Sequence, residues 1–140
     1  MSKPAKRLSP EEIKIRLSPL FDREELRLVL LFGSAASGRT HRGSDIDLAF
    51  LFDSPPDILE LTNDVTQLLH TSAVDVVDLR RASPLLAFAA VQNGTVLFER
   101  SFGLVNEFHS LAFRRYVDTK KLREAQATYI HSFLEERGLA

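Results

Sequence analysis

Two apolar runs joined by a polar connection decide the fold of this chain, and residues 28–52 read LVLLFGSAASGRTHRGSDIDLAFLF. The first run is too short to span a membrane and has the length of a buried strand. Gly33 and Ser34 end it, and small and basic residues follow. The second run opens with Asp45 and Asp47 and then becomes apolar. The pattern therefore predicts two core strands, with two carboxylates at the start of the second.

The spacing of these two acids predicts their chemistry. Side chains alternate along a strand, so Asp45 and Asp47 point to the same face, about 6 to 7 Å apart at the backbone. Neighbouring carboxylates repel each other and lose hydration near a core, and a bound cation removes both penalties. Oxygen ligands favour Mg²⁺, which usually binds one or two carboxylates together with substrate phosphates. We therefore expect a Mg²⁺ site at the start of this strand.

The residues after the first strand fit a phosphate group. Gly33 lets the backbone approach a phosphate closely. Ser34 can begin a short helix whose free N–H groups would face that phosphate. Gly33 and Ser34 are therefore the candidate nucleotide-binding residues.

These residues also carry a family resemblance. Gly33-Ser34, ten residues and then Asp45-Ile46-Asp47 resembles the signature of the DNA polymerase β-type nucleotidyltransferase superfamily. The compact form with SDIDL resembles the minimal nucleotidyltransferases (MNT), which are usually paired with HEPN-domain toxins. The resemblance extends to about Arg100. The alternation of helices and strands by itself favours an α/β or α+β fold. The resemblance implies a small mixed β-sheet flanked by helices, with the helices on one side.

The third acid of the site has two candidates in AVDVVDL, residues 73–79. In the resembled family this acid lies on the strand after the helix that follows the DxD strand, and Asp75 occupies that place. Asp78 is the alternative, but the two cannot both face the metal on a regular strand. For Asp78 we expect a surface ion pair with the arginines that follow it. The resemblance thus implies Asp45, Asp47 and Asp75 as catalytic and metal-binding residues.

The loop departs from the family pattern. MNT proteins often read GSRARG, whereas this chain has Ala35 and Ser37 where those arginines would stand. Arg39 or Arg42 could supply the charge to a triphosphate, or both could be solvated loop residues. This departure bears on nucleotide affinity rather than on the metal chemistry.

The resemblance implies an activity. A Mg²⁺-dependent nucleotidyltransferase, with two metal ions expected, would move AMP from ATP to a tyrosine hydroxyl of a cognate HEPN ribonuclease toxin and so act as an antitoxin. One alternative is transfer to a small hydroxylated molecule such as an aminoglycoside. A second alternative is a non-catalytic module that neutralises the toxin by contact.

Composition sets outer limits on these hypotheses. The 140 residues are expected to form one domain, and the formal net charge of −1 gives no electrostatic reason to expect direct nucleic-acid or membrane binding. The chain has no cysteine, which is compatible with a reducing cytoplasm. We expect a cytoplasmic protein.

The rest of the chain alternates between helical and extended patterns. Residues 1–8 are expected to be disordered. Helices are expected to begin at Ser9-Pro10, after Asp57 and at Ser83-Pro84, with further strands over 73–79 and 95–98. The helix after Ser83 is apolar nearly all round, which predicts burial. Residues 102–137 predict one long C-terminal helix, whose second half could contact a neighbouring subunit in an oligomer. Its basic residues form either a solvated face or a surface that docks a partner.

Overall fold

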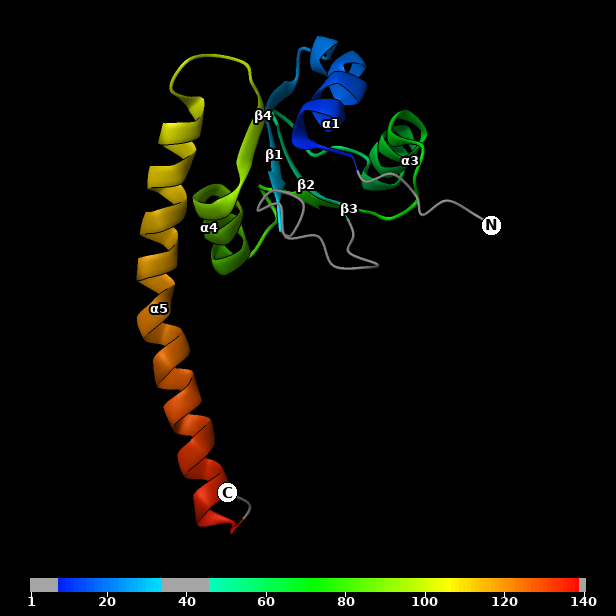
Figure 1. Ribbon diagram of the computed structural model, residues 1–140. Helices are drawn as coiled ribbons and strands as arrows, with labels where there is room; N and C mark the ends of the chain where they lie inside the picture. The colour runs from blue at the N-terminus through cyan, green and yellow to red at the C-terminus, as the bar shows by residue number, and fades with distance from the viewer. Residues whose placement is uncertain (1–7, 34–45, 139–140) are drawn as a thin grey trace, which may run out of the picture.

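The computed structural model describes residues 8–33 and 46–138 (Figure 1). Four strands and their helices follow one another in the order that the sequence patterns predict. They are α1 (Pro10–Leu17), the 3-10 helix η1 (Ser18–Asp22), β1 (Leu26–Phe32), β2 (Ile46–Phe52), α3 (Ile58–Leu69), β3 (Val74–Asp78), α4 (Pro84–Asn93), β4 (Thr95–Glu99) and α5 (Leu104–Glu136).

The four strands form one mixed sheet in the order β3-β2-β1-β4. β1 pairs antiparallel with both β2 and β4, whereas β2 and β3 run parallel. A parallel pair needs a crossover, and α3 supplies it. This topology brings the end of β1 and the starts of β2 and β3 to the same end of the sheet, which we call the carboxylate end.

One face of the sheet packs against α1 and α3. Ile13 and Leu17 of α1, together with Leu61 and Val65 of α3, are fully or almost fully buried against it. Both helices start as the sequence predicts. The hydroxyl of Ser9 accepts the N–H of Glu12 at 3.1 Å, and the carboxylate of Asp57 caps α3. These caps satisfy backbone donors that have no partner inside a helix.

The other face packs against α4 and α5, so the expectation of helices on one side only is wrong (Figure 1). The reason lies in the central strands. Leu48 and Phe50 of β2 face α1 and α3, and Ala49 lies in the cluster on the opposite face. A sheet that is apolar on both faces must be covered on both.

Two details differ from the sequence predictions. Leu8, expected in a disordered end, packs against the core. α4 is less buried than its composition predicts, since Leu85 is 53% exposed and the buried residues are the small Ala87 and Ala90.

The long C-terminal helix is confirmed, as α5. Val105 and Phe108 in its first turns pack against the sheet, and Phe88 of α4 stacks on Tyr116 with ring centroids 4.9 Å apart. Within the described ranges, no helix is both long and apolar enough to cross a membrane.

Candidate active site

The carboxylate end of the sheet gathers three of the predicted site residues. Gly33 follows the last residue of β1, Asp47 is the second residue of β2, and Asp75 is the second residue of β3. They come from segments far apart in the sequence and meet because β1 runs antiparallel to β2 and β3 parallel to it.

Asp47 and Asp75 lie side by side. They are direct register partners across the β2–β3 ladder, and partners in a ladder point to the same face of a sheet. The face is the one that carries Ala49 and Val77, which pack in the cluster beneath α4 and α5. Asp47 is half-buried and Asp75 is exposed on the edge strand. Two carboxylates held this closely on one face repel each other unless a cation or a proton lies between them.

Gly33 is fitted to Asp47. Its φ of +76° lies in the left-handed region that favours glycine. A Cβ built on Gly33 would overlap Oδ2 of Asp47 and lie 3.3 Å from its carboxyl carbon. The glycine therefore leaves room for the Asp47 carboxylate, a role that the sequence did not reveal because the contact depends on the β1–β2 register.

Asp78 lies on the opposite face from Asp75. It is the register partner of Phe50 and is only 8% exposed. Its carboxylate accepts the backbone N–H of Arg80 at 3.0 Å, and its carbonyl accepts those of Arg81 and Ala82. The expected surface ion pair of Asp78 with the following arginines is therefore wrong: a short turn after β3 folds back and uses Asp78 as a buried cap. The predicted opposition of Asp75 and Asp78 across the strand is confirmed.

The remaining predicted site residues lie outside the described ranges. They are Ser34, Asp45 and the loop positions Ala35, Ser37, Arg39 and Arg42. Among residues 8–33 and 46–138, no three acidic, histidine or cysteine side chains form a group that could hold a metal ion. The two described carboxylates nevertheless fit Mg²⁺ chemically, since they are oxygen donors on one face at an accessible edge. A third ligand from Asp45 stays a prediction.

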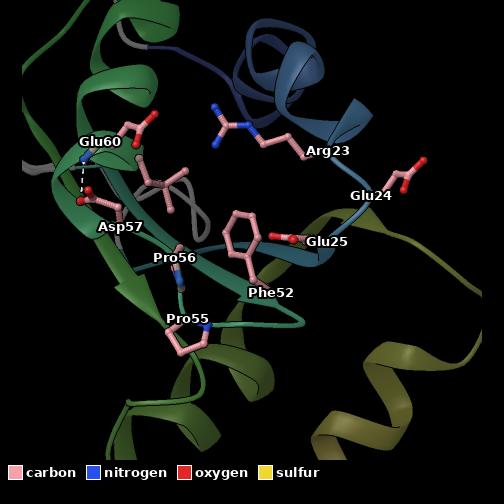
Figure 2. Close-up of a pocket in the computed structure, with 9 residues that line it drawn as sticks. Arg23, Glu24, Glu25, Phe52, Pro55, Pro56, Asp57 and Glu60 are labelled. Atoms are coloured by element: carbon pink, nitrogen blue, oxygen red, sulfur yellow. Dashed lines mark hydrogen bonds between the residues drawn. The ribbon is translucent and has the colours of Figure 1, made fainter.

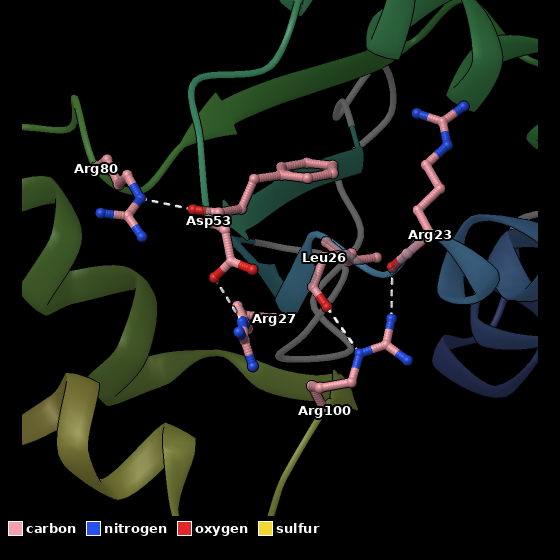
Figure 3. Close-up of polar contacts among 7 residues, drawn as sticks. Arg23, Leu26, Arg27, Asp53, Arg80 and Arg100 are labelled. Carbon is pink, nitrogen blue, oxygen red and sulfur yellow. Dashed lines mark hydrogen bonds and ion pairs between the residues drawn. The ribbon is translucent and has the colours of Figure 1, made fainter.

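The opposite end of the sheet carries arginine side chains that bond to backbone carbonyls and to a carboxylate, and no sequence pattern predicted these contacts. We call it the arginine end (Figure 3). Arg100 donates to three backbone carbonyls, those of Leu26, Phe21 and Arg23. Arg80 donates to the carbonyl of Phe52 at 2.5 Å. These guanidinium groups satisfy strand-end carbonyls, so they hold the fold together rather than bind a substrate.

A salt bridge completes the arginine end. Nε of Arg27 donates to Asp53 at 2.6 Å (Figure 3). This hydrogen bond lowers the pKa of Asp53 and raises that of Arg27. The signal in the sequence is weak. An arginine two residues after the end of β3 and another directly after β4 could have indicated that strand ends are being capped.

A shallow hollow of about 540 Å³ also lies away from the candidate site, beside the arginine end (Figure 2). Its lining comes from the start of β1, the end of β2 and the start of α3: Arg23, Glu24, Glu25, Phe52, Pro55, Pro56, Asp57, Glu60 and Leu61. The acids that line it do not form a metal-binding group, and Arg23 pairs with Asp64 on α3. The size of a hollow is therefore a poor guide to the active site in the described part of this chain.

Comparisons with known proteins agree with the geometry. The model of the family "Polymerase beta, Nucleotidyltransferase" matches residues 16–103, which include β1, β2 and β3. A protein adenylyltransferase MntA of Aphanizomenon flos-aquae is 25% identical over 126 residues, or 81% of this chain and 84% of that protein. A protein adenylyltransferase MntA of Shewanella oneidensis is 42% identical over 77 residues, or 53% of this chain and 55% of that protein.

Solved structures resemble the chain over most of its length. One is a toxin–antitoxin crystal structure with AMP-PNP, with a TM-score of 0.73 and 31% identity over 89% of this chain and 99% of that one. Another is the tri-AMPylated Shewanella oneidensis HEPN toxin in complex with MNT antitoxin, with a TM-score of 0.70 and 26% identity over 87% of this chain and 98% of that one. The chain therefore belongs to the polymerase beta nucleotidyltransferase family, as a member similar to the minimal nucleotidyltransferases named MntA.

Proposed function

We propose that this nucleotidyltransferase moves AMP from ATP to a tyrosine hydroxyl of a cognate HEPN ribonuclease toxin and thereby acts as its antitoxin. One observation carries the proposal: Asp47 and Asp75 are register partners on one face, at the end of the sheet where Gly33 leaves β1. The named relatives support the choice of donor and acceptor, since they are adenylyltransferases and antitoxins bound to HEPN toxins.

The proposed reaction is a displacement at the α-phosphorus of ATP. The acceptor hydroxyl oxygen forms a bond to that phosphorus, the bond to the pyrophosphate oxygen breaks, and pyrophosphate leaves. The hydroxyl proton passes to a carboxylate, most simply Asp75, which is exposed at the edge strand and thus open to an acceptor. Asp47 is half-buried beside Gly33. Asp47, Asp75 and, we expect, Asp45 would hold Mg²⁺. The bound metal would neutralise charge on the phosphates and on the leaving pyrophosphate.

Labelled ATP tests the proposal directly. The purified chain is mixed with Mg²⁺ and the proposed cognate HEPN-domain protein, using ATP labelled at either the α- or the γ-phosphate. We expect α-label, but not γ-label, to enter the HEPN protein, and peptide mass spectrometry to locate AMP on a tyrosine. Failure of α-label to enter that protein would overturn the assignment.

The same experiment separates the two alternatives. Kanamycin replaces the HEPN protein in a parallel reaction, and label in kanamycin alone would favour a small-molecule transferase. If the chain were a non-catalytic binder, its Asp47→Asn, Asp75→Asn variant would inhibit the toxin's ribonuclease activity as well as the unaltered chain does. We expect that variant to leave the ribonuclease active.

A further inference from the structure

The second half of α5 presents apolar side chains to solvent. Leu122 is 58% exposed, Tyr129 71%, Ile130 55% and Phe133 41%. These four residues, which we call the α5 stripe, lie beyond the turns of the helix that pack on the sheet and on α4. A helix of 33 residues is about 50 Å long, so its second half extends beyond what this small sheet can cover.

The α5 stripe continues the side of the helix that faces the domain. Leu122 follows Leu104, Tyr129 follows Leu111, and Ile130 follows Ala112, each after eighteen residues. Eighteen residues are about five helical turns, so each pair points in the same direction. Ala112 is buried, and Leu111 lines a small hollow with Leu79 and Pro84. The stripe therefore faces the side on which the sheet and α4 lie, and not open solvent behind the molecule.

The direction of α5 brings this surface toward the carboxylate end. α5 runs down beside α4 and then continues past the sheet in the direction in which β1 runs (Figure 1). β1 ends at the carboxylate end, where Gly33, Asp47 and Asp75 meet. A molecule seated on the α5 stripe would thus lie below the sheet, on the side where phosphoryl transfer is proposed.

We propose that the α5 stripe docks the protein acceptor and holds it against the carboxylate end. The inference rests on the proposed function and adds the recognition surface to it. The occupant is a folded protein with an apolar groove or helix face, because the four exposed side chains lie within one side of a helix. A protein acceptor is favoured over a second copy of this chain, because α5 extends past the sheet in the direction of the end that an acceptor hydroxyl must reach (Figure 1). The similar solved chains are likewise in complexes of two different proteins, toxin and antitoxin.

A matched pair of variants tests the docking surface. Leu122→Ser with Ile130→Ser removes the middle of the stripe. Val117→Ser with Ala127→Ser changes two exposed apolar residues away from the stripe on the same helix, with similar cost in helix propensity. Each pair is placed in the Asp47→Asn background, and binding to the cognate HEPN protein is measured by calorimetry, so that affinity is read without transfer. Circular dichroism checks that both remain helical.

We expect the stripe variant to bind at least about tenfold more weakly and the control pair to bind as the background does. In the catalytically intact chain, the stripe variant should raise the KM for the HEPN protein and leave Mg²⁺·ATP-analogue affinity unchanged. Equal affinity of the stripe variant and its background would overturn the inference. So would sedimentation showing that the stripe variant only turns a dimer of this chain into a monomer.

The outcomes for the two proposals are distinguishable. If the unaltered chain transfers no AMP, the proposed function fails, although binding to the stripe can still be measured. If it transfers AMP and the stripe variant binds and reacts as well as the control, only the docking surface fails.

Discussion

The two ends of the four-stranded sheet differ in the charged side chains that they carry. At the carboxylate end, Asp47 and Asp75 place like charges side by side on one face. At the arginine end, each guanidinium described above has a backbone carbonyl or a carboxylate as its partner. Two neighbouring carboxylates repel each other and a bound cation would relieve that repulsion, whereas the guanidinium contacts stabilise the fold as it stands. We therefore propose the carboxylate end as the functional one, although the hollow of about 540 Å³ lies beside the other end.

The largest effect is expected from removing charge at the carboxylate end. Asp45→Asn with Asp47→Asn should lower AMP transfer by at least about a hundredfold, because the metal ligands and the electrostatic stabilisation that they support are lost. Thermal unfolding of the metal-free protein should hardly change, since the substitution also removes repulsion. Undiminished transfer from labelled ATP would refute the catalytic assignment of this pair.

Variants of Asp75 and Asp78 test which face of β3 contributes an acid to AMP transfer. Asp75→Ala should reduce transfer by about a hundredfold or more, as expected for a lost proton acceptor and ligand, with little effect on stability. Asp78→Ala should leave most of the activity at low temperature. It should lower the free energy of unfolding by about 1 to 2 kcal/mol, because a buried cap on the N–H of Arg80 is lost. Transfer assays and urea titrations on both variants decide this.

The reverse outcome, an active Asp75→Ala and an inactive but stable Asp78→Ala, would show that the wrong face of β3 has been assigned to the site. A charge-neutral control is available in Asp78→Asn, which keeps a side-chain oxygen able to accept from Arg80. It should recover part of the stability that alanine loses.

Valine substitutions at Gly33 and Gly103 separate the effect of backbone strain on stability from the effect on nucleotide binding. Gly33→Val forces a β-branched residue into a positive φ and also pushes on Asp47, whereas Gly103→Val meets a φ of +93° with open space around its Cβ. Both should lower stability by about 1 to 3 kcal/mol. Only Gly33→Val should weaken binding of Mg²⁺ and a non-hydrolysable ATP analogue in calorimetric titration. Equal affinity of the two variants would mean that Gly33 serves the turn alone.

The sequence predicted most of the fold because its signals are local. A continuous apolar run gives β2, serine and aspartate caps give the helix starts, and strand parity separates Asp75 from Asp78. The predictions failed where a tertiary contact decides the outcome. Leu85 is exposed because other residues of α4, Ala90 and Val91, pack in the cluster with the sheet and α5. The burial of Asp78 accompanies the turn that follows β3. The role of Arg100 joins residues more than seventy positions apart, which no local pattern reveals.

The same limit applies to the site. The acids and Gly33 could be found from spacing and family resemblance, since a DxD pair and a strand-ending glycine are contiguous signals. The contact between Gly33 and Asp47 could not be predicted, because it requires the antiparallel register that pairs Phe32 with Asp47.

The smallest effect is expected at the arginine end, from the exposed pair of Arg27 and Asp53. The hydrogen bond from Arg27 lowers the pKa of Asp53 below its ordinary value, so the ionised form is favoured in the folded state. A carboxyl group of this kind stabilises the fold above its unfolded pKa of about 4 and stops doing so as the pH falls through its lower folded pKa. Asp53→Asn should therefore slightly lower the urea midpoint at pH 7, and the difference from the unaltered chain should shrink as the pH falls below about 4. High salt should reduce the difference at pH 7, because both side chains are exposed to solvent.

A difference that persists unchanged at pH 3 would mean that Asp53 acts through its shape or its other hydrogen bonds rather than through its charge. The arginine end would then be held by backbone capping alone, through Arg80 and Arg100.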